Sequence, residues 1–504
     1  MAKRIGRIFL AVVFGCLLVH PSHAEESGAL QLTVQDAVAI VLTHNLGLKL
    51  ERITPEIKKE NLESAGSIFD PVLSLEGAHS RLETADGDPA DVESTESSLE
   101  AGVEKMYPYG TRLALSMILQ EDLKKAPTTT ITSINPYTTA TNSTTSSNTY
   151  LKTVLALTQP LMKNRGSDVN ERQILIAEND YKKAELAFEQ TVIDTIAQTK
   201  RLYWQLFSAK EQLQVQEKSL LLAKQFLNEV EEKVKVGSAA VLEILEAKAE
   251  VASREDALIR AEYDLMNSQD NLLTYIYGRL EETRSVECIQ KPEIEERVIH
   301  EAELLQKALS LRSNYQSIQY DIDSAEIDSV YWENQKKAQL DLIGSVGYNK
   351  ALTEEAKGDL SYQDYYTGEI KLSLQFPWGF RQDSANYRAA MKTLSRSKLQ
   401  RDTIETQIRL ELRTAVRSVT SAHKRYQSAA LAAQLAEEKL AAEQEKYKSG
   451  LSTSYNVLLY QRDWINAMVN RVDAVINYQL AIVYLNAAAG ITLEQNGIRI
   501  KELF

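Results

Sequence analysis

The chain has 504 residues, of which 25% are charged and 44% hydrophobic, a balance typical of folded proteins and not of disordered ones. This length is enough for several domains. The formal net charge is −13, which argues against nucleic-acid binding as a general role.

Residues 1–24 are predicted to be a secretory signal peptide. Residues 8–19 are apolar but too short to span a membrane comfortably, and Ser22-His23-Ala24 fits a cleavage site. The basic start consists of Lys3, Arg4 and Arg7. An alternative is a lipoprotein signal cut before Cys16, which the bulky Phe14 makes the weaker interpretation.

Removal of residues 1–24 would leave Cys288 as the only cysteine, so the sequence predicts neither an internal disulfide nor a cysteine metal site. Beyond residue 24 no apolar run reaches about 18 residues, so no transmembrane helix is expected. A periplasmic or secreted protein and an outer-membrane β-barrel both remain open, because the signal of a barrel strand is weak.

The sequence is an internal tandem repeat. Two stretches of 70 residues without Gly or Pro lie between Gly166 and Gly237 and between Gly379 and Gly450. Each is preceded by a matching segment, Leu-Thr-Gln-Pro at 157–160 and Leu-Gln-Phe-Pro at 374–377. A repeat of this size predicts one structural unit used twice in the chain.

Both repeats are predicted to begin with a pair of short helices. Residues 36–69 and 303–337 align at a constant offset of 267 residues. Each segment predicts a short helix, a break near residues 45–47 or 312–314, and a second helix of about 22 residues.

Six segments are candidates for strands, at residues 72–82, 99–107, 111–119, 150–158, 340–348 and 369–376, and the polar residues 83–97 and 122–149 are predicted to be exposed loops. The offset between repeats is 267 at Leu73 and Leu340 but 217 at Pro160 and Pro377, so the first repeat holds 50 extra residues. We assign them to an extra hairpin and a long loop. The chain then has six strands, or four if the inner pair is not regular.

The two long stretches are predicted to be single helices. Apolar or small residues recur at spacings of three and four, as at Ile404, Ile408 and Leu412, which is typical of coiled coils. At 1.5 Å per residue each helix would be about 105 Å long, so the structure must be an elongated rod or tube. Shorter helices return over residues 238–277 and 451–489, and the irregular residues 279–299 are expected at the middle level.

Four or six strands cannot close a transmembrane barrel, and an open edge in lipid leaves backbone groups unpaired. A trimer would supply 12 or 18 strands, within the known range, and would place twelve helical rods around one axis. The predicted fold is mainly α and internally duplicated: a long coiled-coil helical barrel joined to a transmembrane β-barrel that trimerisation completes. Such an architecture indicates a conduit and not an enzyme.

The predicted domains follow the repeats. A signal peptide (1–24) precedes a first repeat (25–299), with strands at about 71–160 and a helical hairpin at about 166–278. A second repeat (300–490) has strands at about 338–377 and a hairpin at about 380–490, and a tail covers 491–504.

The chain resembles the TolC-like outer-membrane efflux family over about residues 32–490. The resemblance rests on an ordered set of motifs that occurs twice: Leu-Thr-Gln-Pro-Leu at 157–161, Tyr-Trp-Gln-Leu at 203–206, Val-Lys-Val-Gly at 234–237 leading to Val-Leu-Glu at 241–243, and Tyr-Lys-Ser-Gly at 447–450 leading to Val-Leu at 457–458. It implies a homotrimeric channel in the outer membrane of a Gram-negative bacterium, with a periplasmic tunnel, a periplasmic adaptor and an inner-membrane pump. It implies no cofactor.

The resemblance also implies roles for residues at the two helix turns. Gly237, Ser238, Gly450 and Leu451 would dock the adaptor, although a plain turn explains the two glycines equally well. The pore constriction would involve Glu243, Glu246, Tyr447, Ser452, Asn456 and Leu459.

Three of these positions depart from the family. Asn456 and Leu459 replace frequent acids, and Ser452 replaces an arginine found in some members. A salt-bridge lock is therefore in doubt, and Leu459 and Tyr447 side chains are expected to close part of the pore. Glu246 is explained at least as well as a solvated acid on a helix face.

Nothing in the sequence predicts catalysis. The histidines His44, His79, His300 and His423 lack metal-ligand spacing, and no Gly-rich phosphate loop or nucleophile elbow occurs. The alternative from another class is a periplasmic coiled-coil scaffold or adhesin without a channel. That alternative explains the long helices but not the alternating strands between them.

Overall fold

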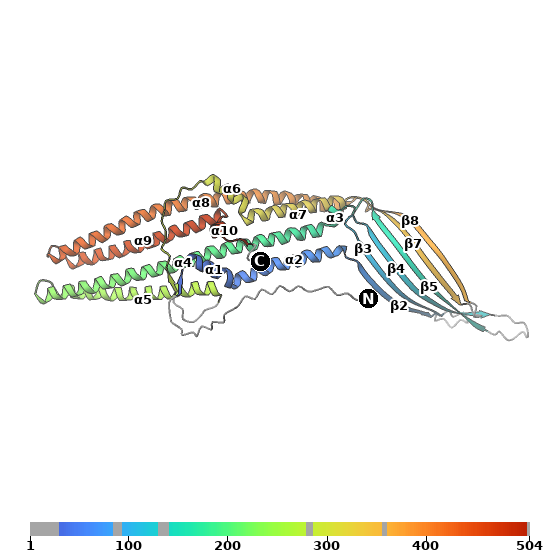
Figure 1. Cartoon of the computed structure of the whole chain (residues 1–504), viewed down its shortest axis with the longest axis horizontal. Coiled ribbons are helices and arrows are strands. Elements are labelled where there is room, and N and C mark those ends of the chain that lie inside the picture. Colours follow the sequence, from blue (N-terminus) through green and yellow to red (C-terminus); the bar gives the residue numbers. More distant parts are fainter. Residues whose placement is uncertain (1–29, 84–92, 130–140, 279–285, 355–359, 501–504) are drawn as a thin grey trace, which may run out of the picture.

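The structure is a computed structural model that describes residues 30–83, 93–129, 141–278, 286–354 and 360–500. The predicted signal peptide, including Cys16, lies outside the described residues. Helical hairpins occupy one end of an elongated molecule and a sheet of long strands occupies the other (Figure 1). None of the described helices is long and apolar enough to cross a membrane.

The helices confirm the predicted duplication. The first repeat contains α1 (Val34–His44), α2 (Leu46–Gly66), the 3-10 turn η1 (Ser67–Phe69), α3 (Ser167–Asn170), α4 (Arg172–Lys235) and α5 (Val241–Tyr277). The second contains α6 (Glu301–Leu311), α7 (Ser313–Gln335), α8 (Arg381–Lys448) and α9 (Ser454–Ala488), followed by α10 (Thr492–Gln495). Both ends of α6 lie 267 residues after those of α1.

The break between α1 and α2 has a local cause. Asn45 leaves the helical conformation with ψ 123, and its side-chain oxygen accepts a hydrogen bond of 2.9 Å from the backbone N–H of Leu48. Arg312 occupies the matching position between α6 and α7, also with ψ 123. Each residue therefore ends one helix and begins the next.

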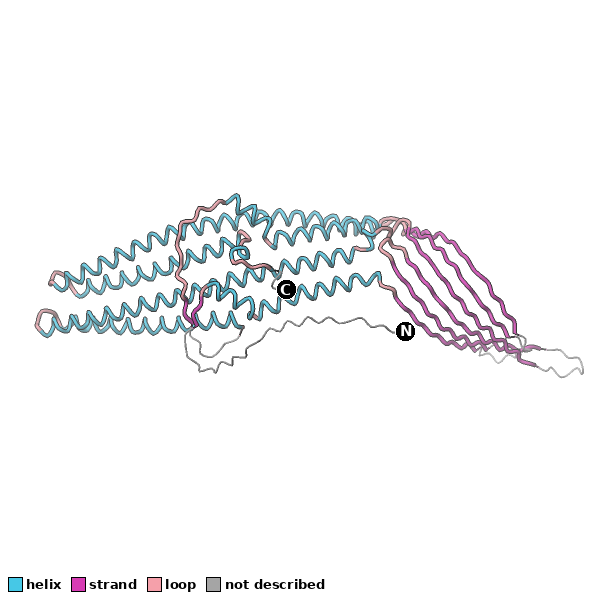
Figure 2. Tube along the Cα trace, in the orientation of Figure 1, coloured by secondary structure: helices cyan, strands magenta, loops and turns pink. Residues whose placement is uncertain are grey.

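The middle level is held by a core around Tyr203 on α4. Two short parallel strands, β1 (Leu30–Leu32) and β6 (Val286–Cys288), cross the helices there (Figure 2). The Tyr203 hydroxyl donates to the carbonyl oxygen of Leu32 at 3.0 Å and accepts from the N–H of Gln290 at 3.2 Å. The irregular segment after residue 285 is thus at the middle level, as predicted, but its short strand was not foreseen.

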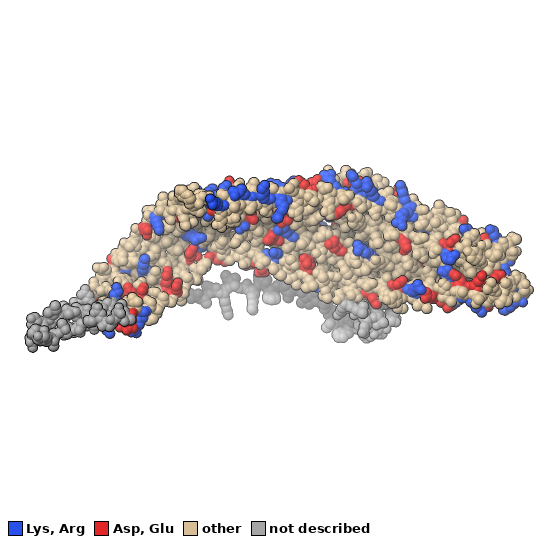
Figure 3. All heavy atoms as spheres, turned by 180° about the vertical axis from the view of Figure 1, so that it is seen from behind, with Lys and Arg blue, Asp and Glu red and all other residues tan. Residues whose placement is uncertain are grey.

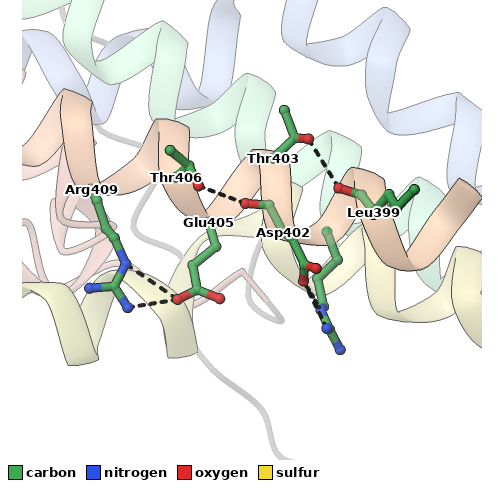
Figure 4. Close-up of polar contacts among 7 residues, drawn as sticks. Leu399, Asp402, Thr403, Glu405, Thr406 and Arg409 are labelled. Carbon is green, nitrogen blue, oxygen red and sulfur yellow. Dashed lines mark hydrogen bonds and ion pairs between the residues drawn. The ribbon is translucent and has the colours of Figure 1, made fainter.

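The solvent side of α8 is stabilised largely within the helix itself (Figure 4). The hydroxyls of Thr403 and Thr406 donate to carbonyl oxygens four residues earlier, at 3.0 and 2.9 Å. Arg409 pairs with Glu405 at 2.7 Å, also across one turn. Pairs of this kind contribute a few tenths of a kcal/mol each, so the helix does not depend on them for a partner surface.

Six long strands form one antiparallel sheet in the order β2-β3-β4-β5-β7-β8. The strands are β2 (Val72–Glu83), β3 (Glu93–Met106), β4 (Arg112–Thr129), β5 (Thr141–Pro160), β7 (Gln339–Glu354) and β8 (Leu360–Gln375). The first repeat supplies four strands and the second supplies two, so the extra hairpin is β3–β4. Strands β2 and β8 are the two free edges of this sheet.

The predicted loops at residues 83–97 and 122–149 are wrong over most of their length, because β3, β4 and β5 extend into them. These extensions carry polar side chains on both faces, so they show no apolar alternation. Cross-strand contacts hold them instead, such as Arg81 with Glu93 at 2.7 Å and Gln120 with Glu96 at 2.8 Å. The remainder of the loops, 84–92 and 130–140, lies outside the described residues.

The strand register separates an apolar face of the sheet from a polar face. Cross-strand partners share a face, and one face carries exposed apolar side chains at Leu73, Leu75, Val103, Leu115, Met117, Leu119, Leu155, Leu157, Val346, Ile370, Leu372 and Leu374. The other carries Ser74, Glu76, Glu100, Ser116, Gln120, Lys152, Asn349, Lys371 and Ser373. An exposed apolar face of this extent requires a cover.

We predict that Leu115→Arg prevents insertion into lipid while Ser116→Arg is tolerated. The two neighbours lie on opposite faces of β4. A lipid-facing arginine near the midplane costs about 2–4 kcal/mol in a barrel, whereas a lumen-facing one costs little. The measurement is the heat-modifiable folded fraction after refolding into vesicles, and equal losses for the two variants would contradict the assignment of faces.

Candidate functional site: the helix-turn tip

Two turns form the end of the molecule opposite the sheet, and they share one geometry. Gly237 and Gly450 both have φ +74, a left-handed conformation that favours glycine. The next residue bonds back across each turn, with Ser238 N–H donating to Lys233 and Leu451 N–H donating to Lys446, both at 2.8 Å. Each glycine therefore ends its long helix in a Schellman motif.

Tyr447 connects the two helical hairpins of one chain. Its side chain is 3% exposed and packs in a cluster with Phe226, Val230, Ala247 and Val457. The ammonium of Lys233 lies 3.6 Å from the centre of the Tyr447 ring and also donates to the Tyr447 carbonyl oxygen. Helix α8 is thereby attached to α4 and α5 at the tip.

Glu243 lies within reach of this tyrosine. The Tyr447 hydroxyl donates to a Glu243 carboxylate oxygen at 3.4 Å, while the other oxygen accepts from the N–H of Ala240 at 3.5 Å. Burial, followed by the Glu243 charge, raises the pKa of Tyr447 to about 12, so the phenol stays a hydrogen-bond donor at neutral pH. Glu246, one turn further on, is exposed.

The second turn is organised by an acid that sequence reasoning missed, Glu443. The Ser452 hydroxyl donates to it at 2.5 Å, and Lys446 lies 3.3 Å away. The amide of Asn456 donates to Ser452 at 3.4 Å. The hydrogen bond from Ser452, aided by Lys446, holds the pKa of the Glu443 carboxyl below its usual range.

The structure brings some of the predicted gate residues together and separates others. Tyr447 meets Glu243, and Ser452 meets Asn456, whereas Leu459 is only half-buried and belongs to neither contact. The prediction that the Tyr447 side chain itself obstructs the pore is corrected, because the ring is enclosed within the chain by Phe226 and its neighbours. Ser238 and Leu451 are exposed at the turns.

A signal for Glu443 was present in the sequence. It continues the apolar seam of α8 after Leu440 and before Tyr447, and its counterpart in the first repeat, 213 residues earlier, is the buried Val230. A charge on an apolar seam predicts a specific partner, since buried charges are paired. Lys233 and Phe226 gave no comparable signal, because lysine and phenylalanine are ordinary on a coiled-coil helix.

The described ranges contain no group of three or more His, Cys, Asp or Glu side chains that could hold a metal ion. The tip instead provides hydrogen bonds and packing between helices. Its chemistry suits a mechanical connection that opens or holds a passage.

Comparison with known proteins places this geometry. Residues 127–276 match the family model of the outer membrane efflux protein family. No curated protein matches the chain.

Solved outer-membrane channels have the same fold. CmeC of Campylobacter jejuni has a TM-score of 0.61 at 17% identity, covering 93% of this chain and 89% of its own. For VceC of Vibrio cholerae the values are 0.62, 14%, 91% and 96%, and for the open-state channel MtrE of Neisseria gonorrhoeae they are 0.61, 15%, 91% and 89%.

The fold is that of an outer-membrane channel, with long helices joined to a sheet that one chain leaves open. The resemblance to the TolC-like outer-membrane efflux family is confirmed, and with it the predicted fold class and the outer-membrane localisation.

We predict that Tyr447→Ala loosens the tip. Truncating a buried aromatic side chain typically costs about 3–5 kcal/mol, which would speed amide hydrogen exchange around Phe226 and Val457 by more than about 100-fold if local opening limits exchange. Tyr455→Ala is the control, because Tyr455 is 65% exposed on the neighbouring helix. Unchanged protection in Tyr447→Ala would contradict the connecting role.

The second turn should resist acid. A carboxyl whose pKa is lowered by folding contributes stability that is present above its unfolded pKa and lost as pH falls through the folded one. For Glu443 we expect exchange at residues 449–453, corrected for intrinsic rates, to be unchanged from pH 7 to 5 and to rise only below the usual carboxyl range. Ser452→Ala should move that onset to higher pH, and an unmoved onset would refute the role of the hydroxyl.

Proposed function

We propose that the protein is the homotrimeric outer-membrane channel of a tripartite efflux or type I secretion system. It would carry small molecules or proteins from the periplasm or an inner-membrane pump to the exterior, and its helix turns would dock a periplasmic adaptor. The observation that carries the proposal is the six-stranded sheet, which has one apolar face and two free edges.

The sheet supports assembly from several copies. Six strands are too few to enclose a lumen, whereas about eight give an interior just filled by side chains and 16–18 leave an aqueous channel. Every described side chain of β2 is exposed, and almost every one of β8. Three copies would supply 18 strands and leave no free edge.

The helical edges support the same assembly. Helix α2 exposes Leu46, Leu50, Ile53 and Ile57 at coiled-coil spacing, and α5 exposes Leu242, Leu245, Ile259, Tyr263 and Met266. These seams have no cover in the single chain, and a neighbouring copy would provide one.

Charge is divided between the two long edges. Helix α8 carries eleven Lys and Arg side chains but four acids between Arg381 and Arg425, and α5 carries eight acids but three bases. In the space-filling view, basic side chains follow the upper edge and acidic ones gather toward the tip on the lower edge (Figure 3). Opposite charges on opposite edges favour head-to-tail association around an axis.

The tip supports a gate between hairpins. Tyr447 attaches α8 to α4 and α5 within each chain, so movement of one hairpin relative to the other must break that contact. An adaptor that binds the turns at Gly237 and Gly450 would act on the same place. The scaffold or adhesin alternative leaves the apolar face of the sheet without a purpose.

Planar-bilayer recording tests the channel and its gate. Glu243→Gln should lower cation selectivity, because three carboxylates converging near the axis attract cations. Glu287→Gln is the control, since that acid lies in β6 beside Lys210 and far from the tip. A protein that forms no channels in the bilayer would sink the proposed function, and equal selectivity in the two variants would remove Glu243 from the pore.

Leu459→Ala should raise the basal conductance of the closed channel, because an apolar ring obstructs ions by dewetting. Leu458→Ala is the matched control: Leu458 is the neighbouring residue and packs toward the core around Tyr447. Equal conductance in the Leu459 variant and the unaltered protein would place the constriction elsewhere.

A further inference from the structure

We propose that the junction between β5 and β7 within the chain is the template for the junction between β8 of one copy and β2 of the next. In that register Ser373 lies opposite Ala78. This inference rests on the proposed trimer and specifies how its 18 strands are joined.

The template is well defined. Strands β5 and β7 come from different repeats yet pair side by side, with Ala156 opposite Ser345 and Leu157 opposite Gly344. The ladder continues beyond the strand end, where Leu161 N–H donates to the Leu340 carbonyl oxygen at 2.7 Å. This junction joins the last strand of the first repeat to the first strand of the second.

Strand β2 is the counterpart of β7. Strand β7 begins at Gln339 and β2 at Val72, 267 residues earlier, the same offset that relates α6 to α1. Within the strands Gly344 corresponds to Gly77. Each strand also follows the second helix of its pair, α7 or α2.

Strand β8 is the counterpart of β5 at an offset of 217 residues. Leu-Gln-Phe-Pro at 374–377 corresponds to Leu-Thr-Gln-Pro at 157–160, and Ser373 corresponds to Ala156. The apolar face is kept, because Leu155 and Leu157 match Leu372 and Leu374. Each strand leads into the long helix of its repeat, α4 or α8.

Transfer of the template gives the new register. It places Ser373 opposite Ala78 and Lys371 opposite Ser80 on the polar face, and Leu374 opposite Gly77 on the apolar face. A slip by one residue would turn the apolar side chains of one strand into the lumen, so only slips of two residues compete.

One competing register has a specific origin. The long helices of the two repeats are related by 213 residues, as Gly166 is to Gly379, and that offset would bring Ser373 opposite Ser74. The difference of four residues arises after the strands, where six residues separate Pro160 from Gly166 but two separate Pro377 from Gly379. The strands themselves therefore keep the offset of 217.

The helices at these edges agree with the pairing. Strand β2 follows α2 along one long edge of the molecule and β8 leads into α8 along the other (Figure 1). Helix α2 exposes the Leu50 and Ile53 side chains and α8 exposes Leu399. A second copy that pairs with the strand edge would cover these residues too.

A cysteine ladder tests the register. Ser373→Cys is combined in turn with cysteine at Ser74, Glu76, Ala78 or Ser80, which all lie on the polar face of β2. A disulfide requires Cα atoms within about 7 Å, so we expect covalent trimers on non-reducing denaturing gels only for the pair at 78 and 373. Ser80→Cys with Lys371→Cys is a second pair in the same register.

Controls keep the outcomes separate. Ala156→Cys with Ser345→Cys should form the template disulfide within one chain, and Ser373→Cys alone should form none, because the native Cys288 is buried. Cross-linking at 74, 76 or 80 in place of 78 would overturn the register while leaving the trimer intact. Trimers by mass that cross-link at no position would overturn the pairing of β8 with β2, whereas a monomer by mass would contradict the proposed function itself.

Discussion

The structure depends on one constraint, which is that a sheet in lipid must leave no backbone group unpaired. The six-stranded sheet has an apolar face suited to lipid, but β2 and β8 each present a free row of N–H and C=O groups. In hydrocarbon each unpaired group costs several kcal/mol. The sheet is therefore an incomplete wall, and closure by other copies follows from its edges.

The helical part repeats this logic with side chains in place of backbone. Each long helix buries a seam within the chain, such as Ile408, Leu412 and Ala415 on α8, and leaves another outward. The contacts at the tip and at the middle level then keep the hairpins in line. Tyr447 holds α8 against α4 at one end, and Tyr203 holds β1 and β6 against α4 at the middle.

Much of this architecture could be predicted because it rests on periodicity. The glycines at 237 and 450, the breaks at Asn45 and Arg312, and the offset of 50 residues each predicted a feature that the structure contains. The strand extensions could not be predicted, since residues held by ladder pairing with polar side chains on both faces show no alternation.

The tip was predictable only in part. Its turns follow from local backbone chemistry, but the burial of Tyr447 depends on Phe226 and Val230, more than 200 residues away in the chain. No local pattern reports such a contact. Glu443 is the exception, because a charge on an apolar seam points to a partner even when the partner is unknown.

The most direct test of the account is electron cryomicroscopy of the full-length protein extracted in mild detergent. The account predicts three copies around one axis, with a closed barrel of 18 strands continuous with a helical tunnel. A monomer with its sheet edges free, or a barrel closed by a different number of strands, would contradict it.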